Sequence, residues 1–446
     1  MDRATELATD LQLAALNNLG QMYANGQGVA QDFHEALACY QQAAERGLPQ
    51  AQSNLAVMYA HGQGVVQDFG QAHHWYRAAA EQGLPYAQSN LAVLYANGQG
   101  TARDYAQALQ WYEAAAAQGD VAAQRGLGVM YANGQGVEKD YAKAMACYEG
   151  GAQAGDPNAQ YGLGVMYANG HGVAQSASLA CQWYQRAADQ GHVHALFNLG
   201  YLYSNGQGVA KDMDKALDCY ARAAALGDAA AQFNLGFMYS SGQGVAKDMD
   251  KALQWYRAAA QQGDAAAQFN LGLLYASGQD VAQDESVALA WYQLAADQGD
   301  AQAQYNLGVM IANGQGTMAS RTVAMQWLQL AADQGDALAW FNIGALAQEG
   351  LEQAPDYTRA LHAYRQAARM GQADAQAALG WLYANGLGVL QDYVRAHMWF
   401  NVGAVGGNAQ AAAGRESVAQ QMTPAQIAQA QELARQCLQN QCEGFD

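Results

Sequence analysis

One alanine returns every 36 residues through the chain, from Ala15 to Ala411, without a slip in register. If that alanine is repeat position 1, positions 12 and 33 are glycine and position 22 is alanine in all eleven full copies. A strict period of about 20 to 50 residues is typical of a solenoid, in which each copy packs only on its neighbours. The chain is therefore predicted to form one elongated domain, and its function must be sought at positions that vary between copies.

The chain is acidic, with a net charge of −18 over 446 residues. Acidity disfavours nucleic acid and anionic membrane surfaces as partners, and it permits a basic protein partner. The same acidity also serves simply to keep a long surface soluble. No apolar stretch is long enough to insert into a membrane. The start, Met1–Glu6, lacks a basic region followed by an apolar run, so we expect a cytoplasmic protein, or a periplasmic or secreted one if the chain is a mature form.

Each copy has the pattern of two helices. In the copy Ala231–Ala266, apolar residues at positions 1, 5, 8 and 9 form the buried stripe of a first helix. Gly236 lies beside Leu235 in this stripe, where the missing side chain lets the partner helix approach. Gly242 and Gly244 are predicted to end the first helix in left-handed conformations. A second helix then follows, and Gly263 ends it.

The second helix is predicted to begin at position 18 in every copy. Asp248 stands there in the copy described above, where its carboxylate can accept hydrogen bonds from free amide groups of the first turn. Nine copies have aspartate at this position, and the other two have Ser176 and Ser320. Serine caps helices as well as aspartate does, so the chemistry is kept where the residue changes.

The full pattern, A-x-x-x-L-G-x-x-Y-x-x-G-x-G-V-x-x-D-x-x-x-A-x-x-W-Y-x-x-A-A-x-x-G, resembles the Sel-one-like repeat (SLR) family, a relative of the tetratricopeptide repeat. The resemblance covers residues 15–410 as eleven copies. It implies an all-α, right-handed α-α superhelix whose first helices line the concave side. Residues 1–14 would form an N-terminal cap segment and residues 411–446 C-terminal capping helices and a tail. In that tail, Thr423 is placed to cap a helix that has Pro424 in its first turn.

Positions 3 and 7 change character along the chain. They share one face of the first helix, offset from the buried stripe, and the resemblance places that face in the groove. Early copies have small or polar residues there, such as Ser53 and Val57, whereas later copies have aromatic ones. The rings are interpreted either as anchors for a protein partner or as packing between repeats. The predicted anchors are Tyr161, Phe197, Tyr201, Phe233, Phe237, Phe269, Tyr305 and Phe341.

Position 4 carries asparagine in most copies, which suits pairing with an extended peptide backbone. The candidates in the aromatic part of the chain are Asn198, Asn234, Asn270 and Asn306. The alternative, which we favour, is that each amide satisfies groups within the protein. Gly126, Gly162 and Ala378 interrupt the series.

Six cysteines do not make a disulfide framework. Cys39, Cys147 and Cys219 fill a position that usually holds tryptophan, so they are interpreted as small apolar side chains. Cys437 and Cys442 lie five residues apart and could bridge if a helix ends between them, but we expect free thiols.

No residue pattern supports catalysis, a cofactor or a metal. Glycine pairs such as Gly26 and Gly28 lack the sequence of a phosphate-binding loop and are explained by the repeat. His192, His194 and His171 could bind an adventitious metal, but we expect solvated loop histidines. No nucleophile motif is present.

Three copies depart from the pattern. Asp280 replaces the second loop glycine of the eighth copy, and Ile311 and Ala347 replace the position-9 tyrosine of the ninth and tenth. The tenth copy also changes its loop, at residues 350–356. These departures either bend the solenoid or are tolerated drift, and we expect drift.

The sequence thus predicts a non-enzymatic adaptor or scaffold that binds a protein or extended peptide through its concave groove. The resemblance implies bacterial adaptor or regulatory work. The alternative is an inhibitor or immunity protein that blocks one enzyme or toxin. Neither the partner nor the oligomeric state follows from the sequence.

Overall fold

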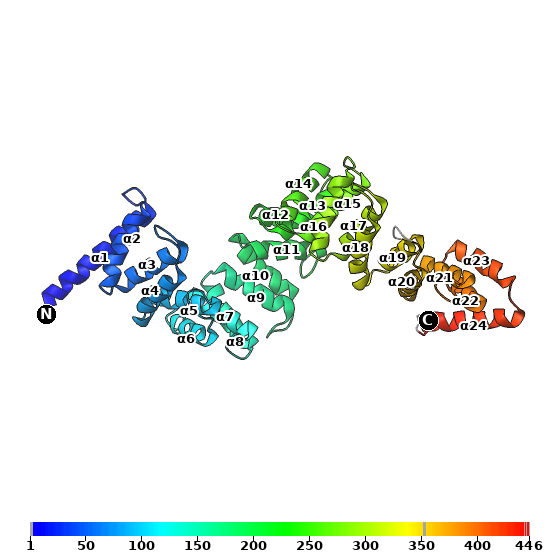
Figure 1. Cartoon of the computed structure of the whole chain (residues 1–446). Coiled ribbons are helices and arrows are strands. Elements are labelled where there is room, and N and C mark those ends of the chain that lie inside the picture. Colours follow the sequence, from blue (N-terminus) through cyan, green and yellow to red (C-terminus); the bar gives the residue numbers. More distant parts are fainter. Residues whose placement is uncertain (1–2, 351–353, 441, 443, 446) are drawn as a thin grey trace. The chain divides into compact units, whose positions relative to one another are not determined.

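The computed structural model describes residues 3–350, 354–440, 442 and 444–445, with side chains from residue 10 onward. These residues form 24 α-helices and no strand (Figure 1). The chain divides into two compact units, Met1–Leu226 and Gly227–Asp446. Within each unit, consecutive helices pack on one another, except that the last helix of the chain packs on the helix two before it. The predicted all-α solenoid of helix pairs is confirmed.

The first unit contains six helix pairs. Their bounds are α1 Arg3–Asn25, α2 Phe33–Glu45, α3 Pro49–His61, α4 Phe69–Glu81, α5 Pro85–Asn97, α6 Tyr105–Ala116, α7 Val121–Asn133, α8 Tyr141–Gln153, α9 Pro157–Asn169, α10 Ala177–Asp189, α11 Val193–Asn205 and α12 Met213–Ala225.

The second unit contains five further pairs and two closing helices. Their bounds are α13 Ala229–Ser241, α14 Met249–Gln261, α15 Ala265–Ser277, α16 Glu285–Asp297, α17 Ala301–Asn313, α18 Arg321–Asp333, α19 Ala337–Glu349, α20 Tyr357–Arg369, α21 Ala373–Asn385, α22 Tyr393–Val405, α23 Ala409–Ala419 and α24 Pro424–Gln439. Residues 3–14 of the predicted cap segment belong to α1, a continuous helix that begins at Arg3. Among the described residues, no helix has the length and apolar character needed to cross a membrane.

Loop glycines end the first helices as predicted. Gly242 ends α13 with a φ of 74°, in the left-handed region. The second loop glycine also lies against the preceding repeat, because a Cβ at Gly316 would lie 2.5 Å from the carbonyl oxygen of Glu285. A side chain at this position would therefore meet both an unfavourable φ and a backbone clash.

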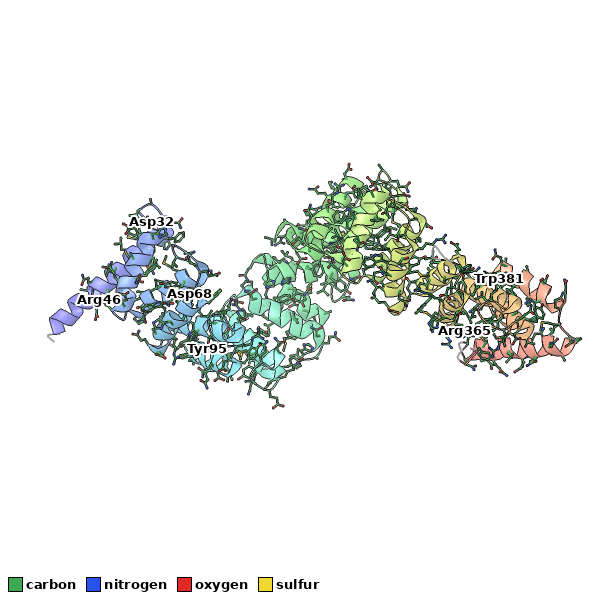
Figure 2. The ribbon with its side chains drawn as sticks, viewed as in Figure 1. Asp32, Arg46, Asp68, Tyr95, Arg365 and Trp381 are labelled. Atoms are coloured by element: carbon green, nitrogen blue, oxygen red, sulfur yellow. A yellow bond between two sulfur atoms is a disulfide. The ribbon has the colours of Figure 1, made fainter. Side chains whose placement is uncertain are left out.

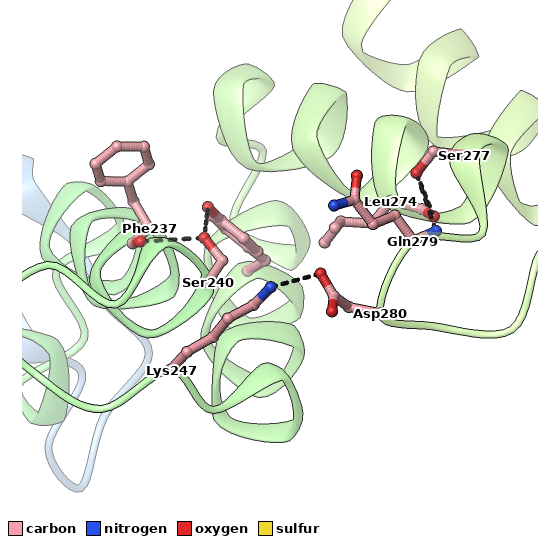
Figure 3. Close-up of polar contacts among 8 residues, drawn as sticks. Phe237, Ser240, Lys247, Leu274, Ser277, Gln279 and Asp280 are labelled. Atoms are coloured by element: carbon pink, nitrogen blue, oxygen red, sulfur yellow. Dashed lines mark hydrogen bonds and ion pairs between the residues drawn. The ribbon is translucent and has the colours of Figure 1, made fainter.

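The departures in the eighth and tenth copies leave both helices of each copy intact. Asp280 takes a φ of 67° without being glycine, and its carboxylate forms an ion pair with Lys247 at 2.6 Å (Figure 3). Gly350 follows α19 with a φ of 89° and a ψ of 135°, outside the left-handed helical region. The rest of the altered loop, residues 351–353, lies outside the described residues.

Side-chain caps begin the second helix of every repeat and the first helix of most repeats, α3, α5 and α21 being without one. The predicted caps of the second helices are confirmed: the Lys251 amide donates to Asp248 at 3.0 Å, and Ser176 and Ser320 accept in the same way. The first helices are capped too, which the sequence reasoning missed. Asp264, at position 34, accepts from the Ala267 amide at 2.7 Å. Equivalent caps are Asp120, Asp156, Asp228, Asp300, Asp336 and Asn408.

The two helices of a repeat approach closely at the position-6 glycine. A Cβ at Gly236 would lie 2.6 Å from Cδ1 of Tyr256, a buried ring on α14. The predicted role of this glycine, close approach of the partner helix, is thus confirmed. Tyr256 also contacts the Ser240 hydroxyl at 3.1 Å, and Ser240 donates to the carbonyl of Phe237 (Figure 3).

Glutamines join neighbouring repeats. Buried Gln268, at position 2, donates to the carbonyl of Ala260 in the preceding copy at 3.1 Å and accepts from Gln298, at position 32 of its own copy, at 2.8 Å. Ala260 lies in the last turn of α14, and its carbonyl also accepts from the Gly263 amide just after the helix, at 3.0 Å. The same glutamine pair forms between Gln52 and Gln82, Gln88 and Gln118, Gln160 and Gln190, Gln232 and Gln262, and Gln304 and Gln334.

The C-terminal helix begins as predicted and ends differently. Thr423 and Gln426 form a capping box at the start of α24, with Pro424 in the first turn. Cys437 and Cys442 are joined in a disulfide, so the expectation of free thiols is wrong for this pair. The helix ends between them, as bridging requires, and the Cys442 amide donates to the Cys437 carbonyl at 2.7 Å.

Candidate partner-binding site

The first helices carry almost no charge. From α3 to α17, their residues include no Lys, Arg, Asp or Glu other than Arg125 on α7. The acidic excess of the chain therefore lies on second helices, caps and loops. The face that the first helices present is neutral, and apolar burial must supply most of its affinity for any partner.

Exposed apolar side chains recur on this face at position 7. Tyr201, Phe237, Leu273 and Trp381 are between 41% and 48% exposed, and Figure 2 shows Trp381 on α21. We call these four side chains the position-7 surface. Tyr201 belongs to the first unit and the other three side chains belong to the second. Large apolar groups at this exposure are typical of protein-binding surfaces when they recur along one face.

The aromatic rings at position 3 are half-buried, and all but Tyr305 pack on a ring of the second helix in their own copy. Phe233 and Tyr256 have ring centroids 5.8 Å apart. Tyr305 instead packs against the apolar core of its unit. These rings therefore contribute to the fold as well as to the surface. The same packing joins Tyr161 to Tyr184, Phe197 to Tyr220, Phe269 to Tyr292 and Phe341 to Tyr364.

The position-4 asparagines are half-buried and bond within the protein. Asn270 donates to the Ala266 carbonyl at 2.8 Å. Asn198 and Asn306 hydrogen-bond to the tyrosines of their own second helices, Tyr184 and Tyr292. Burial raises the pKa of both phenols to about 12, so they stay protonated. Asn234 occupies the equivalent half-buried place on α13. These contacts support internal satisfaction over pairing with a peptide.

Three predicted residues line one hollow in the first unit. Tyr161 on α9 and Asn198 and Tyr201 on α11 surround a hollow of about 340 Å³. In the second unit, Phe341 lines a hollow of about 450 Å³ together with Trp381. Phe233, Phe237, Phe269 and Tyr305 lie on the successive first helices α13, α15 and α17.

Two further hollows lie in the early, polar part of the chain, which the sequence reasoning passed over. They measure about 470 Å³ and about 450 Å³, and both are lined by Arg125 and Val129. Gly126 lines the first and Gly162 the second, where most copies have asparagine. The sequence does contain a signal for these hollows. Arg125 is the lone charged residue on the first helices from α3 to α17, and the asparagine series is interrupted beside it, at Gly126, and in the next copy, at Gly162.

The expectation of a solvated loop histidine is wrong for His192. Its half-buried ring caps α11, with Nδ1 accepting from the Ala195 amide at 3.1 Å, and it stacks on Tyr161 with centroids 4.6 Å apart. Burial, reinforced by His194, lowers the pKa of His192. His171 stacks on Tyr141 instead. In the described part of the chain, no three His, Cys, Asp or Glu side chains gather as metal ligands.

Comparison with known proteins shows repeats along most of the chain. The Sel1 repeat model matches residues 13–48, 49–84, 85–120, 121–156, 157–192, 193–228, 229–264, 265–300, 301–336, 337–372 and 373–404. No curated protein is significantly similar to the chain.

Solved structures share the repeat architecture. A protective antigen of uropathogenic Escherichia coli strains, which displays an SLR fold, is 34% identical over 99% of this chain and 95% of that one, with a TM-score of 0.73. A Sel1 repeat protein from Oxalobacter formigenes is 33% identical over 68% of this chain and 88% of that one, with a TM-score of 0.52. Sel1 repeat proteins are generally protein-interaction modules. With eleven matched repeats and a relative of this identity along nearly its whole length, the chain belongs to the Sel1 repeat family.

Proposed function

We propose that this chain is a non-enzymatic adaptor that binds a protein partner through the face of its first helices. The observation that carries the proposal is the position-7 surface: exposed aromatic and aliphatic side chains on first helices, three of which, α11, α13 and α15, contain no Lys, Arg, Asp or Glu. Burying one such ring against a partner contributes roughly 1.5–3 kcal/mol, so a few anchors suffice for specific binding.

An adaptor is preferred to an inhibitor of one enzyme because the exposed side chains recur at the same position in both units. A repeated anchor spacing suits an extended segment, or several partners, better than one compact active site. The two roles differ in outcome, since an inhibitor binds one folded enzyme and abolishes its activity, whereas an adaptor leaves its partner active.

A matched pair of leucines in the eighth copy tests the surface. Leu273 on α15 and Leu294 on α16 are both 46% exposed, but only Leu273 belongs to the position-7 surface. We expect Leu273→Ser to reduce capture of partners from an extract of the source organism at least tenfold, as loss of an interface anchor does. Leu294→Ser should leave capture unchanged, and both variants should keep the wild-type melting temperature. Equal capture by both variants would place the binding surface elsewhere.

The compartment is a separate part of the proposal. The Cys437–Cys442 disulfide favours an oxidising compartment over the cytoplasm, which fits the expectation for a mature, exported form. Alkylation of thiols in fractionated cells, before and after reduction, tests this. Two additional labelled cysteines after reduction support export, and full labelling without reduction supports the cytoplasm.

A further inference from the structure

The two hollows beside Arg125 in the first unit share Arg125 and Val129 as lining residues, and we call them together the Arg125 cavity, with two parts. Arg125 lines both parts, from α7. Arg103 lines the part toward α5, and Lys139 the part toward α9, so both parts have a second cation. Tyrosine rings complete the walls, including Tyr86 in the first part and Tyr161 in the second.

Two glycines let tyrosine rings of the second helices form walls of this cavity. At Gly126, a Cβ would lie 2.5 Å from the Tyr112 ring, and at Gly162, 2.9 Å from the Tyr148 ring. The neighbouring repeats have Asn90 and Asn198 at this position. Glycine in two consecutive copies thus lets Tyr112 and Tyr148 lie against the first helices, where they line the openings on the two sides of Arg125.

Arg125 is held in place rather than free to fold away. Its Nη1 lies 3.3 Å from Oδ2 of Asp156, whose other oxygen caps α9 through the Ala159 amide at 2.6 Å. A guanidinium carries five N–H donors, and the Asp156 contact involves one nitrogen. The group is therefore oriented by an internal carboxylate while retaining capacity for a second carboxylate. Asp156 balances one charge, and Arg103 and Lys139 leave the lining cationic.

We propose that the Arg125 cavity receives a glutamate or aspartate side chain from a segment of a partner protein. The carboxylate bonds to the Arg125 guanidinium, and the neighbouring partner residues pack on Val129 and the tyrosine walls. Charge complementarity selects this occupant, because Arg125 is the one Lys, Arg, Asp or Glu on the first helices from α3 to α17. The inference rests on the proposed function and specifies the partner's chemistry: an acidic anchor, although the chain itself is acidic.

Paired peptide mixtures test the acidic anchor. The probes are acetylated and amidated octapeptides carrying a neutral fluorophore, with one central residue fixed as Glu or Gln and uncharged residues randomised elsewhere. In fluorescence anisotropy we expect the Glu mixture to bind the full chain about tenfold more tightly than the Gln mixture, as a charge-assisted hydrogen bond allows. The preference should disappear in Arg125→Gln. No preference for Glu, including no binding by either mixture, overturns the proposal, as does a preference that survives Arg125→Gln.

Two variants separate charge from shape. Arg186→Gln removes an exposed arginine from the second helix α10 and should leave the preference intact. Gly162→Asn keeps Arg125 but brings the usual side chain against the Tyr148 ring, and it should weaken Glu binding at least fivefold at a temperature at which the variant is folded. Unchanged binding by Gly162→Asn contradicts the cavity. If the peptides show no preference while Leu273→Ser still loses its partner, the acidic anchor is wrong and the adaptor function stands.

Discussion

At the scale of single residues, one backbone carbonyl at the end of each second helix influences which side chains suit the junction with the next copy. In most copies a position-2 glutamine of the next copy donates a hydrogen bond to this carbonyl. The sixth copy has Leu196 instead, and there Arg222, at position 28, donates to the Ala188 carbonyl at 2.7 Å. Its position-32 residue is also apolar, Leu226, so the glutamine pair is replaced as a whole. Two different sets of side chains thus solve the same hydrogen-bonding problem.

This equivalence predicts a rescue in the eighth copy. Gln268→Leu removes the side-chain hydrogen bond to the Ala260 carbonyl, which keeps the Gly263 amide at 3.0 Å, and we expect a loss of about 0.5–1.5 kcal/mol in the free energy of unfolding. Adding Leu294→Arg places an arginine at position 28, as in the sixth copy, and should recover most of that loss. Urea denaturation of the two variants measures it. A double variant no more stable than Gln268→Leu would show that the arginine contact depends on other features of the sixth copy.

His192 predicts a local sensitivity to acid. Its Nδ1 caps α11 only when the ring is neutral, and burial, with His194 nearby, lowers its pKa in the folded state. The unfolded value is about 6.5, so this stabilisation is complete above that pH and is lost as pH falls through the folded pKa. Tyr161 and Asp156 are the other titratable neighbours.

The measurement compares the wild type with His192→Asp, which installs the cap used by most copies and stays ionised at both pH values. We expect the wild type to lose more thermal stability than the variant between pH 7.5 and pH 5.5. The other histidines titrate equally in both proteins, so their contributions to the loss of thermal stability cancel in the comparison. Identical losses would mean that protonation of His192 does not weaken the cap.

At the scale of helices, the sequence determined most of the fold because each boundary had its own chemical signal. Position-12 glycines and position-18 caps are nearly invariant, so both ends of the loop between helices could be predicted. The caps of the first helices were missed for the opposite reason. Position 34 varies among aspartate, His192, Asn408, Gln372 and leucine, and the pattern therefore hid a function that most of these side chains share.

The missed caps predict measurable stability. Asp264 is half-buried and accepts from the Ala267 amide at 2.7 Å. Asp264→Ala should reduce the free energy of unfolding by about 1 kcal/mol, whereas Asp264→Asn should cost little, since Asn408 caps α23 in the same way. Chemical denaturation of both variants checks this. A loss as large for asparagine as for alanine would assign the effect to the carboxylate charge rather than to the hydrogen bond.

At the scale of the whole molecule, the sequence predicted which positions share a face of the first helix, but not how deeply their side chains are covered. Positions 3 and 7 of the third copy line one hollow together, with Ser89 and Val93. The sequence could not show that position-3 rings are half-covered, because the covering tyrosine is about 23 residues away on the second helix. The Arg125 cavity was missed because predicting it requires three residues to be considered together: Gly126 and Gly162 in consecutive copies, and the charged Arg125.

The distribution of charge over the molecule makes the last prediction. The chain has 39 acidic and 21 basic residues, yet the first helices from α3 to α17 hold only Arg125 among them. A partner bound on that face is held by apolar contacts and a single ion pair. Its dissociation constant should therefore rise by less than about threefold between 50 and 500 mM NaCl, although exposed charges are strongly screened over this range.

A partner held by the acidic second helices and loops would behave differently. It would need a basic surface, and its affinity would fall by about tenfold or more over the same range of salt, because many screened pairs contribute. Isothermal titration calorimetry at both salt concentrations distinguishes these surfaces for any partner that Leu273→Ser fails to capture. A steep dependence of the dissociation constant on salt would place the binding site on the acidic second helices and loops. It would also favour a basic partner, which the net charge of the chain permits.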